Sequence, residues 1–315
     1  MKQLAPYIES VYYNGKPPND HRPFNHGSAQ SPPLLRPHGM NRLLVFPGSF
    51  NPPHRGHSDL LSFAFRNAGD DMHVTGAIIL LTDDNRLIDK NASVDNALVL
   101  PKETRAQLCR AQFPDDWAWV YDGSEDSWPG FQKGLVDKLQ KDRIELKFML
   151  LGGPDWFSVN EILGFGEWGC DDCITSDVSR PVDFRHPYNM MKLPNCSAWD
   201  TPRIDFLRLE KQIQAKLRNK SKQEIEEAVN VAYARLKAIS VCRRLKSKGY
   251  VRFTPCNLEL RPKEAPSSTK IRELIAASTG DEQLAKALGC LVTNPQMLID
   301  CVQAHRKSTG LVVQE

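Results

Sequence analysis

The chain has 315 residues, 41% of them hydrophobic and 25% charged, and its formal net charge is +3. This is enough chain to bury a full core, and no apolar run reaches the roughly 18 residues that would cross a membrane. We therefore expect a globular protein with no membrane partner. The eight cysteines are scattered, which fits a reducing compartment better than a disulfide framework.

Residues 1–40 form a proline-rich segment that holds seven of the 22 prolines. Glycine, asparagine and serine lie between the prolines, and hydrophobic periodicity is weak. We predict an arm that is either poorly ordered or wrapped over the surface of a domain at 41–315.

The first strongly patterned stretch begins with an apolar run at 42–47, a predicted strand, and ends in a predicted helix at about 56–67. The loop between them, Gly48–His57, reads Gly-Ser-Phe-Asn-Pro-Pro-His-Arg-Gly-His. Its first glycine allows a ligand to approach the backbone closely, and a helix start offers unpaired N–H groups to an anion. His54 and His57 both lie on the turn that enters the helix. The pattern predicts a phosphate-binding loop.

Strands and helices continue to alternate after this loop, which indicates an α/β fold with a doubly wound parallel sheet. The predicted strands are 73–81, 117–121, 145–151 and 174–178, and the predicted helices are 102–112 and 130–141. The ligand crevice of such a sheet lies at the carboxyl ends of its strands. There we expect Gly48, Gly152, Asp155 and Arg180 to gather.

Residues 200–248 interrupt this alternation with two amphipathic patterns, which predict a helical pair inserted before the last strand at 250–253. The segment carries 13 Lys and Arg against 6 Asp and Glu. Because no regular pattern of aromatic residues is interleaved with these charges, we expect a solvated face and no nucleic-acid partner. A protein partner that binds this helical pair, and an oligomer, remain open.

A second motif, Ser267–Arg272, reads Ser-Ser-Thr-Lys-Ile-Arg and opens an apparent helix. Together with the loop Gly48–His57, in this order, it resembles the paired signatures of the nucleotidylyltransferase superfamily. The flanking sequence is most similar to nicotinamide mononucleotide (NMN) adenylyltransferases and their fungal relatives. The resemblance covers about 41–180 and 250–306.

This resemblance implies a Rossmann-like nucleotidylyltransferase fold and transfer of AMP from Mg²⁺-bound ATP to the phosphate of NMN, which gives NAD and pyrophosphate. Catalysis would rest on alignment and charge stabilisation, with His54, His57 and Arg272 as catalytic residues. No metal is expected on protein side chains. The implied ATP- and phosphate-binding residues are Gly48, Ser49, Phe50, Gly56, Ser267, Ser268, Thr269 and Lys270.

Further nucleotide contacts are implied for Lys90, in a polar loop after the second strand, for the turn residues Gly152, Gly153 and Asp155, and for Arg180. One departure concerns the acceptor. The relatives place a Trp-Glu pair after the third strand, with the tryptophan ring on nicotinamide, where this chain has Gly123-Ser124. Either Trp128 takes over the stacking, with Trp156 and Trp168 as other candidates, or the acceptor is not NMN.

The alternatives are therefore a nucleotidylyltransferase or ATPase of the same fold with another acceptor, and a nucleotide-binding adaptor. Cys170 and Cys173 form the only C-x-x-C pair, and we expect no zinc site there. The lack of a signal-like apolar stretch predicts a cytoplasmic protein, and the basic run at 243–248 leaves a nuclear address open as well.

Overall fold

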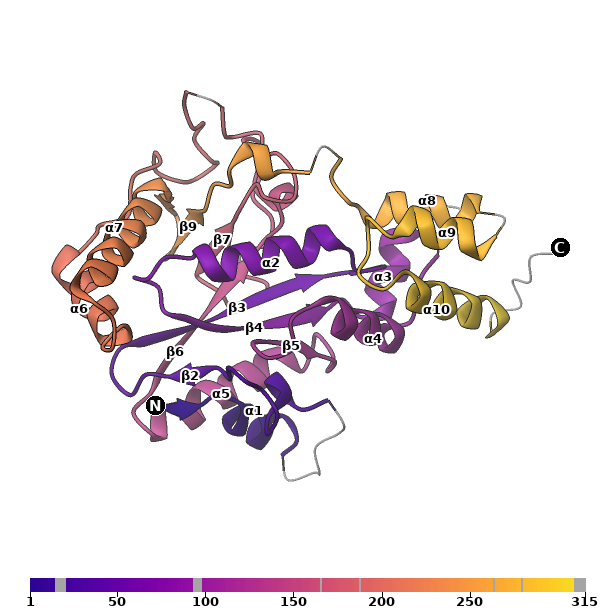
Figure 1. Cartoon of the computed structure of the whole chain (residues 1–315). Coiled ribbons are helices and arrows are strands. Elements are labelled where there is room, and N and C mark those ends of the chain that lie inside the picture. Colours follow the sequence, from indigo (N-terminus) through magenta and orange to yellow (C-terminus); the bar gives the residue numbers. More distant parts are fainter. Residues whose placement is uncertain are drawn as a thin grey trace.

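The computed structural model describes residues 1–14, 21–92, 98–164, 166–186, 188–262, 264–278 and 280–308. Its centre is a seven-stranded sheet in the order β5-β4-β3-β6-β7-β9-β8 (Figure 1). The strands are β3 (Met40–Gly48), β4 (Val74–Leu81), β5 (Ala118–Tyr121), β6 (Glu145–Leu151), β7 (Asp172–Thr175), β8 (Ser240–Arg243) and β9 (Tyr250–Phe253). All neighbours pair in parallel except β8 and β9. Numbered along the chain, the parallel strands lie in the order 3-2-1-4-5-6 of the Rossmann fold, so the predicted fold class is confirmed.

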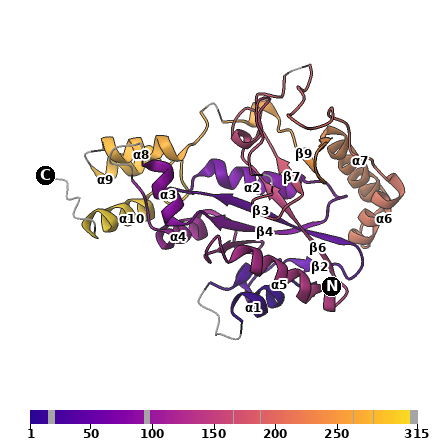
Figure 2. The same ribbon diagram turned by 180° about the vertical axis from the view of Figure 1, so that it is seen from behind.

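Helices cover both faces of this sheet (Figures 1 and 2). Helices α2 (Arg55–Asn67) and α4 (Lys102–Gln112) pack on one face, and α1 (Ala5–Tyr12) and α5 (Trp128–Lys141) cover the other. Successive side chains of a strand point to opposite faces, so each strand contributes side chains to the apolar layers on both faces of the sheet. Along β3 the even-numbered apolar residues pack beneath α2, while the odd-numbered ones pack with α5. A strand buried on both faces reads as a continuous apolar run, which is why the sequence predicted it well.

The N-terminal segment packs against the α5 side of the sheet. Strand β1 (Lys2–Gln3) pairs with β2 (Leu34–Leu35), and α1 buries Ile8 in the same apolar cluster as α5. Tyr12 donates a hydrogen bond to Asp122, which follows β5. The described parts of the arm, 1–14 and 21–40, therefore contribute to the core, and the part of the prediction that concerns 15–20 lies outside the described residues.

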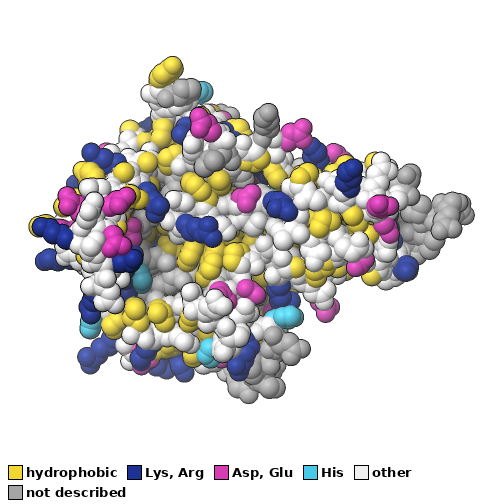
Figure 3. Space-filling view, in the orientation of Figure 1, with side chains coloured by type: hydrophobic (Ala, Val, Ile, Leu, Met, Phe, Trp, Pro, Cys, Tyr) yellow, Lys and Arg dark blue, Asp and Glu magenta, His cyan; other side chains and the backbone are white. Residues whose placement is uncertain are grey.

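The predicted helical pair consists of α6 (Phe206–Lys216) and α7 (Lys222–Ala238), which share a small apolar cluster of their own. Ser221 caps α7 by accepting a hydrogen bond from the backbone N–H of Glu224. Over these helices the surface shows both signs of charge side by side (Figure 3). The chain then forms β8, antiparallel to β9. This strand lies inside the segment 200–248 that was assigned to the helical pair, and the sequence pattern did not predict it.

The C-terminal helices α8 (Ser268–Ala277), α9 (Asp281–Leu288) and α10 (Pro295–Ser308) form a third apolar cluster with Leu100 and Leu108. This unit contacts the first motif, because the backbone N–H of Arg55 donates to the carbonyl of Leu291 at 2.7 Å. The remaining elements are α3 (Asp84–Asn91) and the short turns Pro23–Asn25, Pro154–Trp156 and Leu258–Leu260. None of the helices in the described ranges is both long and apolar enough to span a membrane.

Candidate active site

A cavity of about 560 Å³ opens at the carboxyl ends of β3 and β6, between which the strand order reverses. In doubly wound sheets ligands bind at this switch point. Both sequence motifs contribute to the walls. The predicted residues that line the cavity are Gly48, Ser49, Phe50, His54, Gly56, His57, Lys90, Gly153, Asp155, Arg180, Ser267, Ser268, Thr269 and Arg272.

The imidazole rings of the two histidines of the first motif are stacked at the cavity wall. Their ring centroids are 3.6 Å apart and their planes differ by 19°. The backbone N–H of His54 donates to Nδ1 of His57 at 3.2 Å. Since Nδ1 accepts this bond, the proton of neutral His57 resides on Nε2, which makes that atom a hydrogen-bond donor.

Burial keeps both rings uncharged. It lowers the pKa of His54 to about 3, with a further contribution from the positive charge of Arg180. Burial also lowers the pKa of His57 well below 6.5, and His54 and Arg180 act in the same direction. At neutral pH the pair therefore presents neutral donors, and an anion in the cavity would raise both pKa values.

This pKa shift predicts a pH-dependent stability. Unfolding returns each imidazole to a pKa near 6.5, so below that pH the unfolded chain binds more protons than the folded chain. The free energy of unfolding should be highest above about pH 6.5 and fall by up to about 1.4 kcal/mol per pH unit per imidazole as the pH drops further. Urea denaturation between about pH 7.5 and pH 5.5 measures this slope. His54→Asn should flatten it, and equal slopes for variant and wild type would contradict the assignment.

The two glycines of the first motif make room for protein side chains. A Cβ at Gly48 would lie 3.0 Å from the Phe50 ring, and a Cβ at Gly56 would lie 3.2 Å from the His54 ring. Phe50 has a positive φ of 45°, which turns its ring back over the loop. Because Gly48 and Gly56 have no side chain, the rings of Phe50 and His54 can pack at the cavity.

The second motif is hydrogen-bonded to the first. Ser267 is the N-cap of α8, and its hydroxyl accepts from the backbone N–H of Lys270 at 3.1 Å. The Ser268 hydroxyl donates to the carbonyl of Pro52 at 2.8 Å. Arg272 donates to the carbonyl of Asn51 at 2.7 Å through Nη1. The N-terminus of α8 is thus fixed beside the histidine loop, and its positive dipole end faces the same cavity.

Three predicted residues do not line the cavity. The Lys270 ammonium forms an ion pair with the exposed Glu264. Gly152 packs against the Phe157 ring, which a Cβ would approach within 2.4 Å. Trp128 is only 1% exposed, and its Nε1 donates to the carbonyl of Trp168 at 3.2 Å. Trp128 is the first residue of α5 and packs in the core, so the structure does not place it where its ring could stack on a ligand in this cavity.

Other lining residues were not predicted, notably Arg86 and Glu125. Glu125 directly follows Gly123-Ser124, and it reaches the cavity from the loop after β5. Lys90, predicted in a loop, lies on α3. These positions were detectable in principle, because the pattern had already located the end of β5.

Trp156 and Trp168 also line the cavity, and we call their part of its lining the tryptophan wall. Trp168 is 7% exposed, and its indole Nε1 is buried with no hydrogen-bond partner within the described part of the chain. Indole N–H groups usually find a partner when they are buried. This wall therefore offers an aromatic surface.

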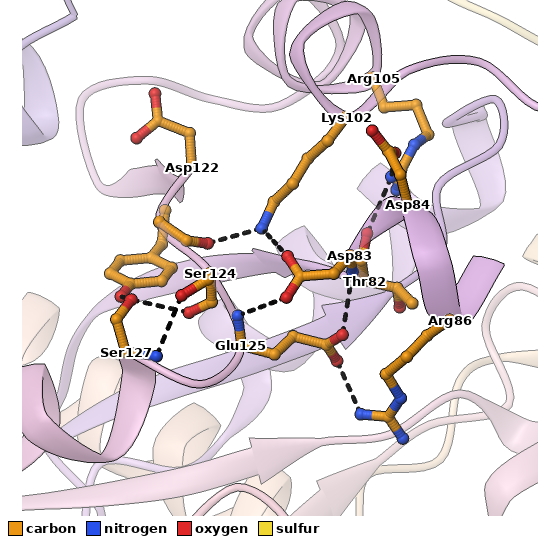
Figure 4. A network of polar contacts seen from close by, with 12 residues as sticks. Thr82, Asp83, Asp84, Arg86, Lys102, Arg105, Asp122, Ser124, Glu125 and Ser127 are labelled. Carbon is orange, nitrogen blue, oxygen red and sulfur yellow. Dashed lines mark hydrogen bonds and ion pairs between the residues drawn. The ribbon is translucent and has the colours of Figure 1, made fainter. Parts of the chain in front are cut away.

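Arg105 connects the histidine loop to the end of β4, and Figure 4 shows it beside Thr82 and Asp84. Its guanidinium is fully buried and donates to the carbonyls of Ser49 and Thr82, each at 2.8 Å, and to Asp84 at 2.6 Å. These contacts give Arg105 a structural role. In the described ranges, no group of three His, Cys, Asp or Glu side chains is arranged to hold a metal ion.

Comparison with known proteins places these observations in a family. A search of solved structures matches the nicotinic acid mononucleotide adenylyltransferase of Plasmodium falciparum complexed with NaAD, at 10% identity and a TM-score of 0.40, over 84% of this chain and 96% of that chain. That likeness is too low to support a shared substrate. Curated protein sequences give no match. A family model described as cytidylyltransferase-like matches residues 45–274, well over half of the chain. The chain therefore belongs to the cytidylyltransferase-like family of nucleotidyltransferases.

Proposed function

We propose that this nucleotidyltransferase transfers AMP from Mg²⁺-bound ATP to the phosphate of NMN, producing NAD and pyrophosphate. The observation that carries the proposal is the convergence of His54, His57 and Arg272 with the N-terminus of α8 on one cavity at the switch point of the sheet. This set can bind a triphosphate and stabilise negative charge without supplying a nucleophile.

The proposed reaction is an in-line displacement. An oxygen of the NMN phosphate forms a bond to the α-phosphorus of ATP while the bond from that phosphorus to the pyrophosphate oxygen breaks. Nε2 of His57 donates a hydrogen bond to an α-phosphate oxygen, where charge changes during the transfer. Arg272, the hydroxyls of Ser267 and Thr269 and the backbone N–H of Ser268 hold the β- and γ-phosphates. Arg180, Gly153 and Asp155 contact the nucleoside.

Mg²⁺ would reach the site as the Mg·ATP complex. Mg²⁺ usually keeps several waters and takes phosphate oxygens as ligands, with one or two protein carboxylates at most. The lining of the cavity is rich in hydroxyl and cationic groups, which fits a metal carried by its phosphates. The bound ion would neutralise charge on the β- and γ-phosphates.

The acceptor would bind toward the tryptophan wall. The nicotinamide ring would stack on Trp156 or Trp168. Arg86 and Lys90 supply positive charge on α3, which suits the acceptor phosphate. Trp128 has no part in this arrangement.

A second candidate function uses the same ATP donor and a different acceptor. It is favoured by Gly123-Ser124, which stands where the relatives carry the Trp-Glu pair. Another phosphate monoester such as phosphocholine or phosphopantetheine, or water, would then be adenylylated.

Pyrophosphate release from Mg·ATP distinguishes these candidates. We expect release with NMN, little release without an acceptor, and NAD as the product. Release of similar size without any acceptor would identify an ATPase, and release only with phosphocholine or phosphopantetheine would identify the second candidate.

A further inference from the structure

A closed network of hydrogen bonds joins the ends of β4 and β5 beside the cavity (Figure 4). The backbone N–H of Asp83 donates to Oε2 of Glu125 at 2.9 Å, and the backbone N–H of Glu125 donates to Oδ2 of Asp83 at 2.9 Å. Each carboxylate therefore accepts from the backbone of the other residue. This reciprocal pair fixes the position of the Glu125 side chain relative to both strands.

Lys102 and Arg86 complete the network at its two ends. Nζ of Lys102 lies 2.5 Å from Oδ1 of Asp83 and 2.6 Å from the carbonyl of Gly123. Nη1 of Arg86 lies 3.0 Å from Oε1 of Glu125. The order of charges is thus Lys102, Asp83, Glu125 and Arg86, with a cation at each end and the two carboxylates in the middle.

Only one end of this network reaches the cavity. Glu125 and Arg86 line it, whereas neither Asp83 nor Lys102 does. The Lys102 side chain is 15% exposed and that of Glu125 is 8% exposed, while Arg86 is 61% exposed. Arg86 would therefore sample many positions if Glu125 did not hold it.

The charge state of Asp83 agrees with this arrangement. Burial would raise the pKa of its carboxyl, but the hydrogen bonds from Lys102 and from the Glu125 N–H outweigh burial and lower that pKa. Asp83 is therefore ionised over the whole neutral range, and the network needs no protonation event to form.

We propose that Asp83 and Lys102 are positioning residues, which orient Glu125 and through it Arg86 on the acceptor side of the cavity. The proposal rests on the function proposed above and assigns the network to the acceptor half of the reaction. Charge-assisted hydrogen bonds to both carboxylates hold the Arg86 guanidinium where a phosphate monoester can meet it.

Lys102→Met tests the proposal, because methionine keeps most of the side-chain volume and removes the ammonium. Loss of the ammonium leaves the Asp83 carboxylate and the Gly123 carbonyl without their donor, so the reciprocal pair loosens. We expect kcat/KM for NMN to fall about 10-fold or more, while the KM for ATP changes by less than about 2-fold. Asp83→Asn should likewise lower kcat/KM for NMN and leave the KM for ATP nearly unchanged. Lys102→Arg should retain part of the kcat/KM for NMN that Lys102→Met loses.

Asp122→Asn is the matched control. Asp122 lies in the same segment after β5 and forms an ion pair with Arg110 at 2.6 Å, but it does not line the cavity and belongs to no part of the network. This variant should lower thermal stability by a similar amount and leave both kinetic constants within about 2-fold. If Asp122→Asn reproduced the loss in kcat/KM for NMN, the network would have only a structural role, and the proposal would be overturned.

Hydrogen exchange separates the proposal from the reaction on which it rests. In Lys102→Met, peptides that cover 82–87 and 123–127 should exchange faster, while the peptide that covers 48–57 should exchange as in the wild type. A wild-type protein that makes no NAD would contradict the proposed function only. Unchanged exchange at 82–87 and 123–127 would overturn the positioning role, whatever the activity.

Discussion

His57→Asn is expected to lower kcat for NAD formation by about 10²- to 10³-fold, with a much smaller change in the KM for ATP. Asparagine can still accept the hydrogen bond from the His54 N–H in place of Nδ1, but it has no group at the position of Nε2. The variant therefore removes the donor to the α-phosphate and keeps the contact that shapes the loop. Steady-state kinetics with Mg·ATP and NMN measures the effect.

His57→Gln is the matched variant for this prediction. The glutamine amide reaches the position of Nε2 and can donate there, so it should recover about 10-fold of the lost kcat. Circular dichroism must show that both variants fold, because His57 also packs against Phe50, with 4.9 Å between ring centroids. Equal activity of the Asn and Gln variants would contradict a donor role for Nε2.

Arg272→Met is expected to weaken ATP binding by about 10- to 100-fold, because it removes charge-assisted hydrogen bonds to the triphosphate. The guanidinium is already oriented by the carbonyl of Asn51 at 2.7 Å and by the Thr269 hydroxyl at 3.2 Å. Binding of AMP, which lacks the β- and γ-phosphates, should change by less than about 3-fold. Isothermal titration calorimetry with ATP and with AMP gives both numbers.

Lys270→Met is the control within the same motif. The structure pairs Lys270 with Glu264 outside the cavity, so removing this charge should leave ATP affinity within about 2-fold of the wild type. A loss equal to that of Arg272→Met would show that Lys270 leaves Glu264 and binds phosphate, as the sequence resemblance implied. An equal loss of ATP and AMP affinity in Arg272→Met would contradict the assignment of Arg272 to the terminal phosphates.

The sheet and the phosphate side of the site were predictable because local sequence determines them. A parallel strand buried on both faces needs a continuous apolar run, and β3, β4 and β6 each have one. Gly48 and Gly56 are required by close contacts within a few residues. Topology then brings the two motifs together, since the strand ends meet at one edge of the sheet.

The remaining differences depend on contacts between distant segments. Strand β8 has four residues, and only the free edge of β9 selects a strand there. Helix α3 buries little besides Leu87, so its pattern resembles a polar loop. By contrast, Trp128 has apolar partners at helical spacing, Phe131 and Leu135, and this periodicity could have indicated a core position.

The residues that we propose to bind the acceptor were the hardest part of the site to predict. Arg86 lies on α3 and Glu125 follows β5, and nothing in the local pattern shows that the two strand ends place them in one ion pair. The same holds for Trp168, which reaches the cavity through a long irregular segment between β6 and β7. Tertiary packing, and not the periodicity of the sequence, decides which residues line this part of the cavity.

The most direct test of the account is to follow the α-phosphate itself. Purified protein should be incubated with Mg·ATP labelled at the α-phosphate, with and without NMN, beside His57→Asn, and the products separated. The account predicts label in NAD only when NMN is present, and almost none in the variant. Label that appears as free AMP at the same rate with or without NMN would contradict it, because the cavity would then activate water instead of holding a phosphate acceptor.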